Sequence, residues 1–295
     1  DGGPPLVLRS DAATALPGSL DRAAEFAVIA AARARGVLTP TARFLARDLV
    51  RPGASAYFLD WVDGTAIGAR VTRHPSLAPA RAGLVAAVAE QAARVHQVTP
   101  EAHAELPIQR PPFGLDRDPA QAVIALIADT LDRLPAPRPG AELGLRWLRA
   151  NRPAPAPQTL VHGDFRTGNF MLTPAGLQGV LDWEFCHWGD PAEDLGWLCV
   201  RDWRFGVVDH PVGGFGQRGD LLAAYAAAGG RPIEPARLHW WEVAGNLKWG
   251  AFAVMQGLRY RQGQADLELA AIPRRAAEME FEALRLIDQG PEASR

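Results

Sequence analysis

The sequence reads His-Gly-Asp-Phe-Arg-Thr-Gly-Asn at residues 162–169 and Gly-Val-Leu-Asp-Trp-Glu at residues 179–184. Between these stretches, two apolar runs flank a turn that contains proline and glycine, and this pattern predicts a β-hairpin. A hairpin brings its outer ends together. We therefore expect Asn169 and Asp182 to lie side by side, with Asp164 on the loop just before them.

Three oxygen-bearing side chains at one place suit phosphoryl transfer. Magnesium is a hard cation that prefers a carboxylate and other oxygens, and it completes its shell with water and substrate phosphates. We expect Asn169 and Asp182 to hold Mg²⁺ together with ATP, while Asp164 acts as the base for a substrate hydroxyl. His162 is interpreted as a brace for the loop backbone.

Other interpretations of this segment are weaker. The first three residues of the motif alone are compatible with a simple turn, and Asp182 alone with a surface acid. The hairpin pattern and the spacing of 18 positions from Asp164 to Asp182 (182 − 164) argue against both. A serine hydrolase would need a Gly-x-Ser-x-Gly elbow, which the sequence lacks. A metal hydrolase would need more histidines near His162.

With these residues, the chain resembles the aminoglycoside phosphotransferase and choline kinase superfamily, which has a two-lobed, protein-kinase-like fold. The resemblance covers nearly the whole chain and includes residues 189–195, where Asp194 resembles a buried acid that braces the catalytic loop. Residues 197–206 and 212–215 are similar to a bacterial subgroup that resembles the kinase domain of acyl-CoA dehydrogenase fusion proteins. That domain phosphorylates 4-hydroxyacyl-CoA, so the resemblance implies a hydroxyacyl-CoA as one candidate substrate.

Hydrophobic periodicity around the hairpin predicts an α+β fold with a small β-rich N-lobe and a large, mostly helical C-lobe. We expect the N-lobe to cover residues 1–63, with a hinge at about 57–64, and the C-lobe to cover residues 64–295. The expected elements are strands at 5–9, 42–46 and 56–62, helices at 19–36, 77–98, 118–134 and 140–150, a β-rich segment at 159–184, and mostly helix over 192–288.

The resemblance also implies roles in the N-lobe. Arg9 falls where kinases place the lysine that binds ATP phosphates, and Glu25 falls where a helix glutamate pairs with that cation. A guanidinium group can bind phosphate through two hydrogen bonds. The hinge that offers backbone groups to adenine would be Asp60, Trp61 and Val62. An arginine at the end of a strand and a helix glutamate are also compatible with solvated charges.

Only eight residues precede Arg9, whereas two typical strands with a phosphate-covering loop need roughly 20. We therefore expect a truncated N-lobe, in which either the chain begins late or part of the nucleotide clamp is lost. This shortage motivates a different class of function, a pseudokinase-like module that binds a ligand or partner without phosphoryl transfer.

Several further residues are candidates on weaker grounds. Glu184 is expected to support magnesium or contact substrate, although it is also compatible with a surface acid. Arg166 is expected to steady the transferring phosphate, although a salt bridge with a neighbouring acid would also explain it. Arg204 and Trp241 are candidate substrate contacts in a region rich in tryptophan and arginine, where helical spacing is also typical of core packing. The mixed charge of this region disfavours a polycationic aminoglycoside substrate.

Composition narrows the class of protein. Of the 295 residues 48% are hydrophobic, and the net charge is −2, which argues against nucleic acid as a partner. Two cysteines do not form a disulfide framework, and the sequence shows neither a signal peptide nor a membrane-spanning stretch. We expect a soluble cytoplasmic protein that acts on a small-molecule hydroxyl and does not bind membranes. Its oligomeric state is not indicated.

Overall fold

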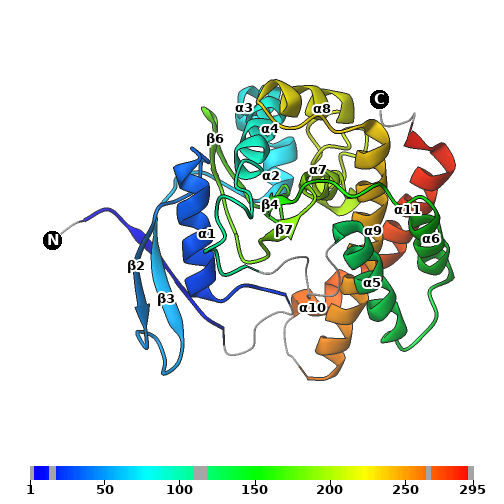
Figure 1. Ribbon diagram of the computed structural model, residues 1–295, viewed down its shortest axis with the longest axis horizontal. Helices are drawn as coiled ribbons and strands as arrows, with labels where there is room; N and C mark the ends of the chain where they lie inside the picture. The colour runs from blue at the N-terminus through cyan, green and yellow to red at the C-terminus, as the bar shows by residue number, and fades with distance from the viewer. Residues whose placement is uncertain (1–2, 13–17, 109–117, 264–266, 292–295) are drawn as a thin grey trace.

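Three antiparallel strands and one helix come first in the structure (Figure 1), a computed structural model that describes residues 3–12, 18–108, 118–263 and 267–291. The sheet has the order β1-β3-β2, and the central strand β3 buries Ala56 and Tyr57. Arg9 pairs in register with Tyr57 across the β1–β3 ladder. The elements are β1 (Leu6–Ser10), α1 (Arg22–Ala34), β2 (Ala42–Arg47) and β3 (Ser55–Asp60).

Helix α1 covers one face of this sheet. Asp21 caps it by accepting a hydrogen bond from the Ala24 backbone N–H (2.8 Å), which is why the helix begins three residues later than the sequence pattern suggests. Its buried positions recur at helical spacing and include Glu25, Val28 and Ile29. A charged side chain in this buried stripe needs an oppositely charged or hydrogen-bonding partner. Glu25 is therefore expected to pair with a group beside the sheet.

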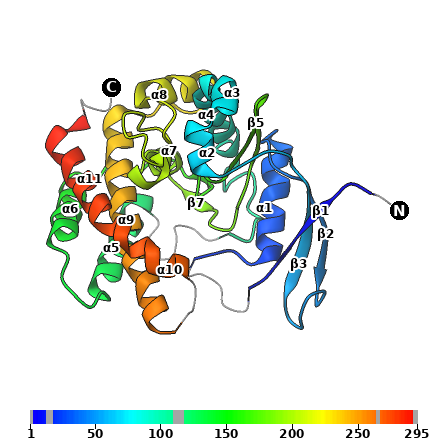
Figure 2. The same cartoon turned by 180° about the vertical axis from the view of Figure 1, so that it is seen from behind.

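The rest of the described chain is mainly helical (Figure 2). Helix α9 is the central helix of this part and packs against α5, α6, α7 and α11. The single helix expected over 77–98 is wrong in detail, because the backbone turns at Gly83 and separates two helices. The helices are α2 (Gly68–Arg73), α3 (Ala78–Ala82), α4 (Leu84–Val95), α5 (Pro119–Asp132), α6 (Pro139–Ala150), α7 (Pro191–Leu198), α8 (Arg218–Ala227), α9 (Pro235–Arg261), α10 (Leu267–Ala271) and α11 (Ala276–Gln289).

Two short strand pairs lie between the sheet and the helices. The predicted hairpin is confirmed as β5 (Phe170–Thr173) and β6 (Gly176–Val180), while β4 (Thr159–Val161) pairs with the additional strand β7 (His187–Gly189). The hairpin is tied to the N-terminal part by the Val180 N–H, which donates to the Leu38 carbonyl (2.7 Å). The observed mixture of helices and small sheets confirms the predicted α+β fold class.

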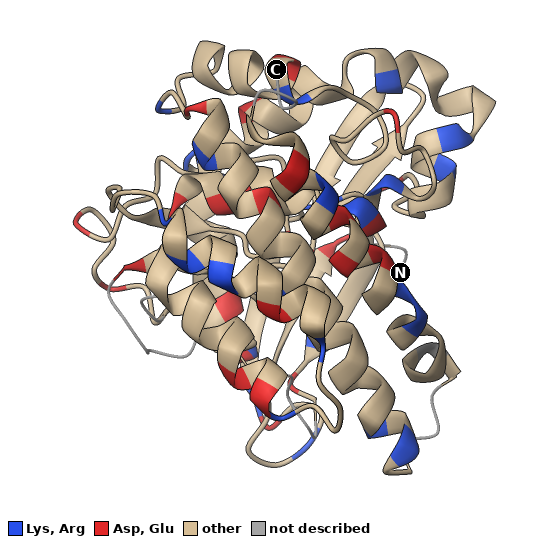
Figure 3. Ribbon diagram, turned by 90° about the vertical axis from the view of Figure 1, so that its right-hand side faces the viewer, with Lys and Arg blue, Asp and Glu red and all other residues tan. Residues whose placement is uncertain are grey.

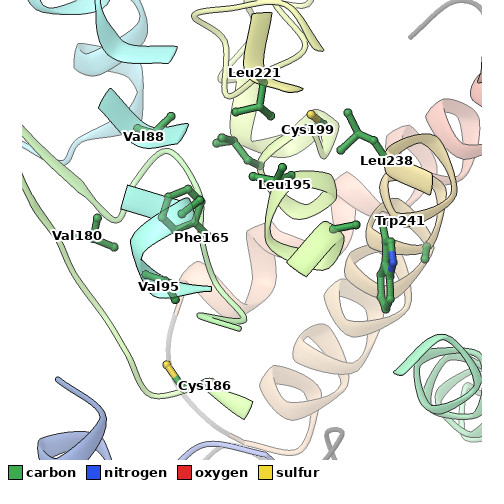
Figure 4. Close-up of a cluster of buried hydrophobic side chains, with 14 of the residues drawn as sticks. Val88, Val95, Phe165, Val180, Cys186, Leu195, Cys199, Leu221, Leu238 and Trp241 are labelled. Carbon is green, nitrogen blue, oxygen red and sulfur yellow. The ribbon is translucent and has the colours of Figure 1, made fainter. Parts of the chain in front are cut away.

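One hydrophobic core runs through the helical part and reaches the loop before the hairpin. Figure 4 shows Phe165 among the side chains of this core, near Val88 and Val95 of α4. Phe165 is completely buried and packs edge-on against the ring of Phe170 (4.9 Å between centroids). The loop that carries Asp164 is therefore anchored in the core by its own next residue.

A buried ion cluster joins α9, α11 and the 3₁₀ turn Arg201–Arg204. Arg204 is only 1% exposed, and its Nη2 lies 2.9 Å from both Glu242 Oε1 and Glu282 Oε1. The expectation that Arg204 contacts substrate is therefore wrong: its charge is needed to neutralise two buried carboxylates. The cluster holds Arg201, Arg204, Arg218, Arg285, Glu242 and Glu282.

The expected role of Trp241 is corrected in the same way. Its side chain is 2% exposed, and its indole N–H donates to Asp190 Oδ2 (2.8 Å), the same oxygen that Arg237 contacts. Trp241 therefore packs α9 against the start of α7 and does not face a ligand surface. No helix within the described ranges is long and apolar enough to span a bilayer.

The ion cluster predicts a pH-dependent stability. Burial favours a high pKa for Glu282, but Arg285, Arg204 and Arg201 lower it to about 2, from 4.5. The lowered pKa means that the ionised group stabilises the fold above about pH 4.5, and that this contribution is lost as the pH falls toward 2. We expect Glu282→Gln to destabilise the protein by about 3 kcal/mol at pH 7, with the difference shrinking below pH 4.5.

Urea unfolding of both proteins at several pH values measures this effect. Glu278→Gln is the matched control, because Glu278 lies on the same helix but is 44% exposed and should matter little. A Glu282→Gln difference that stays constant down to pH 2 would contradict the assigned ion pairs.

Candidate active site

The loop between β4 and β5 brings the predicted Asp164, Asn169 and Arg166 together. Asp164 Oδ1 accepts hydrogen bonds from Arg166 Nε and Trp197 Nε1 (both 2.9 Å), while Oδ2 accepts one from Asn169 Nδ2 (2.7 Å). The same Asn169 nitrogen donates to the Asp164 backbone carbonyl (2.9 Å). Because both contacts use the amide nitrogen, the amide oxygen of Asn169 takes no part in holding Asp164.

The backbone of this loop is held by hydrogen bonds to the Asp194 carboxylate on α7. Its Oδ2 accepts the His162 N–H (2.8 Å) and its Oδ1 accepts the Gly163 N–H (3.0 Å). His96 Nε2 lies 3.1 Å from the same carboxylate. The structure thus places Asp194 where the sequence predicted the bracing acid.

His162 links the loop to the far end of the hairpin. Its Nδ1 accepts the Asp164 backbone N–H (3.2 Å), and its Nε2 donates to the Leu181 carbonyl (3.1 Å). Burial lowers the pKa of His162, and a neutral ring is what one accepting and one donating nitrogen require. His162 therefore fixes the distance between Asp164 and the residue that precedes Asp182.

The outer ends of the hairpin lie together as expected. The Leu181 N–H donates to the Asn169 carbonyl (2.8 Å), which places Asp182 beside Asn169 along the backbone. Asp182 has a positive φ of 69°, a strained conformation for a residue with a side chain. This turn directs its carboxylate toward β1, where Arg9 Nη2 lies 3.0 Å from Asp182 Oδ1.

Two arginines and three carboxylates join the sheet, α1 and the end of the hairpin. Arg9 pairs with Glu25 (3.1 Å) and lies 3.7 Å from Glu184, so its predicted partner is confirmed by the geometry. Burial opposes the charge on Arg9, but Glu25 and Asp182 raise its pKa. Arg22 contacts Glu25 and binds Glu184 Oε2 (2.7 Å). Arg22 was not predicted from the sequence, although its i,i+3 spacing from Glu25 on a helix was a usable signal.

A cavity of about 250 Å³ opens between the sheet and the hairpin. Arg9, Glu25 and Asp182 form its polar end, and its remaining lining is largely apolar. The predicted hinge residues also line it, although the Asp60 and Trp61 N–H groups already donate to the Thr41 and Pro5 carbonyls. The apolar and hinge lining residues include Val7, Leu59, Asp60, Trp61, Val62, Met171 and Leu181.

The residues present suit Mg²⁺, which takes only one or two carboxylates from protein and completes its shell with water and phosphate oxygens. Asp182 Oδ2 and the amide oxygen of Asn169 have no hydrogen-bond partner among the described residues, whereas Glu184 is held by Arg22 through one of its oxygens, Oε2. No cluster of three or more His, Cys, Asp or Glu side chains with metal-site geometry occurs in the described part of the chain. A site built entirely from protein ligands is therefore not indicated there. Figure 3 marks the basic and acidic residues along the ribbon, and segments of both signs occur on the side that it displays.

Comparison with known proteins gives the following matches. Residues 1–241 match the family model described as "Phosphotransferase enzyme family". Mouse acyl-CoA dehydrogenase family member 10 is 29% identical over 199 residues, which cover 66% of this chain and 18% of that protein. The chain spans less than a fifth of the length of the curated relatives it matches.

Two solved structures share the fold. A candidate aminoglycoside phosphotransferase from Ralstonia eutropha has a TM-score of 0.73 at 18% identity, covering 98% of this chain and 94% of that chain. The GDP complex of wild-type aminoglycoside 2′-phosphotransferase-IIIa has a TM-score of 0.58 at 14% identity, covering 88% and 82%.

The tight turn at Gly163 yields a prediction about the loop. Gly163 has a φ of 79°, and a Cβ there would lie 2.3 Å from the Phe185 carbonyl oxygen. Gly53 has the same φ, but a Cβ added there would meet nothing within 4 Å, so it carries the same backbone strain without the clash. We expect Gly53→Ala to cost about 1 kcal/mol of unfolding free energy and Gly163→Ala at least ~2 kcal/mol more.

Denaturant unfolding of the two variants measures this difference. Equal losses in both variants would show that the close approach of Gly163 to Phe185 does not constrain the loop.

Proposed function

Because the chain belongs to the phosphotransferase enzyme family, we propose that it transfers the γ-phosphoryl group of ATP to a hydroxyl of a small molecule, with Asp164 as base. The family match covers most of the chain and confirms the resemblance noted in the sequence. The observation that carries the proposal is the set of contacts joining Asp164, Asn169 and the hairpin end at Asp182.

The free positions on Asp164 indicate how the base would act. A carboxylate has about four lone-pair sites. Arg166 and Trp197 occupy two on Oδ1, and Asn169 occupies one on Oδ2, so Oδ2 retains one position for a substrate hydroxyl. The hydroxyl proton would move to Oδ2 as the hydroxyl oxygen bonds to the γ-phosphorus and the bond from that phosphorus to the leaving ADP oxygen breaks.

The nucleotide would lie in the cavity beside β1. The apolar lining, with Val7, Leu59 and Met171, suits a planar base, and Arg9 at the polar end suits phosphate oxygens. A structural relative is a GDP complex, which supports nucleotide binding at this fold. We propose residues 57–64 as the hinge between an N-lobe of residues 1–63 and a C-lobe of residues 64–295.

Asn169 and Asp182 would hold Mg²⁺, with Glu184 holding Arg9 and Arg22 in place behind them. When bound, the ion would neutralise charge on the phosphates. Arg166 is anchored at Asp164 and lies over the Trp203 ring (4.3 Å to the centroid), so its position fits the proposed contact with the transferring phosphoryl group.

For the substrate we propose a hydroxyacyl-CoA. The support is the relative named acyl-CoA dehydrogenase family member 10, together with the buried indole rings of Trp197 and Trp203 next to the base. An aminoglycoside or amino-alcohol acceptor is the alternative that the structural relatives suggest. A binding module without phosphoryl transfer is less favoured, because Asp164, Asn169 and Asp182 are all present and connected.

The proposal predicts that Asp164→Asn lowers turnover at least ~10³-fold while Mg·ATP affinity stays within about twofold, because the base acts on the acceptor and not on the nucleotide. ADP release in the presence of 4-hydroxyacyl-CoA substrates gives turnover, and calorimetry gives affinity. Asp209→Asn is the control, because Asp209 is an exposed acid distant in sequence from the loop. Undiminished turnover in Asp164→Asn would exclude the assigned base.

A further inference from the structure

Helix α7 reaches the catalytic loop at two points, one turn apart. Asp194 binds the backbone N–H groups of His162 and Gly163, and Trp197, three residues later, donates its indole N–H to Asp164 Oδ1 (2.9 Å). Residues at i and i+3 lie on the same face of a helix. The helix therefore holds both the backbone of the loop and the carboxylate of the proposed base.

The indole ring of Trp197 is fixed on several sides. The Lys248 ammonium lies 4.3 Å from the ring centroid, and Trp203 packs against the ring at 5.5 Å. A Cβ added at Gly245 would lie 3.5 Å from Trp197 Cε3, an ordinary van der Waals distance, so helix α9 also packs beside the ring. The side chain cannot turn away from Asp164 without displacing these neighbours.

Lys248 is itself held by a buried pair. Its Nζ lies 3.1 Å from Glu193 Oε1, and His187 Nε2 lies 3.2 Å from Glu193 Oε2. Burial favours a high pKa for Glu193, but Lys248 and His187 lower it to about 2. The carboxylate is therefore charged at neutral pH and keeps the ammonium over the indole.

The neighbouring rings of Trp203 and Trp249 show that packing in this cluster does not by itself require the hydrogen bond from Trp197 to Asp164. Trp203 is buried in the same cluster, and its indole N–H has no hydrogen-bond partner among the described residues. Trp249 donates its indole N–H to Asp202 (2.6 Å), away from the loop. Of these three rings, Trp197 directs its only polar atom at the proposed base.

We propose that Trp197 is a positioning residue that selects which oxygen of Asp164 meets the acceptor hydroxyl. An indole N–H is a donor only and can neither accept nor exchange roles with a carboxylate. With Arg166, it fills Oδ1, so that Oδ2 alone is presented to the acceptor. This inference rests on the proposed function, in which Asp164 is the base.

The test compares Trp197→Phe with Trp249→Phe. Each variant keeps an aromatic ring in the cluster and loses one indole hydrogen bond to an aspartate, but only the first loses a contact to Asp164. The probe is Mg·ATP with a 4-hydroxyacyl-CoA or, without added alcohol, with water as acceptor. We expect kcat to fall about tenfold in Trp197→Phe with KM for ATP unchanged, because a hydrogen bond to a charged group is lost at the acceptor side only. In Trp249→Phe we expect kcat to stay within about twofold.

A spectroscopic measurement is independent of turnover. In ¹⁵N-labelled protein, the indole signal of Trp197, assigned from its loss in Trp197→Phe, should move upfield in Asp164→Ala, whereas the Trp249 signal should not. An unmoved Trp197 signal would overturn the contact. Equal kcat losses in both phenylalanine variants, a parallel change in KM for ATP, or full activity in Trp197→Phe would overturn the positioning role.

The outcomes separate this inference from the function on which it rests. If Asp164→Asn remains fully active, the proposed base is wrong. If Asp164→Asn is inactive and Trp197→Phe is as active as the wild type, only the positioning role fails.

Discussion

The buried carboxylate of Asp194 is the constraint on which the site depends. It is completely buried and accepts two successive backbone N–H groups, those of His162 and Gly163. Loss of this acceptor would leave the buried His162 donor unpaired, at a cost of about 1–3 kcal/mol, and the partly buried Gly163 donor unpaired at a smaller cost. This fixed start of the loop precedes the sharp turn at Gly163, the core position of Phe165 and the side chain of Asp164.

A second interaction joins the sheet to this loop. Arg9 and Arg22 lie among Glu25, Asp182 and Glu184, which come from α1 and from the end of the hairpin. The three carboxylates would repel one another without the two guanidinium groups. The ion pairs of Glu25 with these guanidinium groups explain why its carboxylate can be buried in the packing face of α1. This pairing also places a cation beside the residue that would bind magnesium.

The local pattern was sufficient to predict the hairpin and the meeting of Asn169 with Asp182, because turn residues and apolar alternation are short-range signals. Partners such as Trp197 for Asp164 depend on how α7 packs under the loop, and no spacing in the sequence encodes that. The prediction for Arg204 failed for the same reason: its two carboxylate partners lie 38 and 78 positions away (242 − 204 and 282 − 204). A sequence motif shows which residues have side chains suited to catalysis or binding. Long-range packing decides which of those side chains are exposed to a ligand.

Calorimetric titration of the chain with ATP, with and without magnesium, shows whether the proposed nucleotide site exists. We expect saturable binding that requires Mg²⁺ and weakens at least about tenfold in Asp182→Asn, because one charged ligand of the ion is removed. Binding of equal strength without magnesium, or no binding at all, would contradict a Mg·ATP site between β1 and the hairpin.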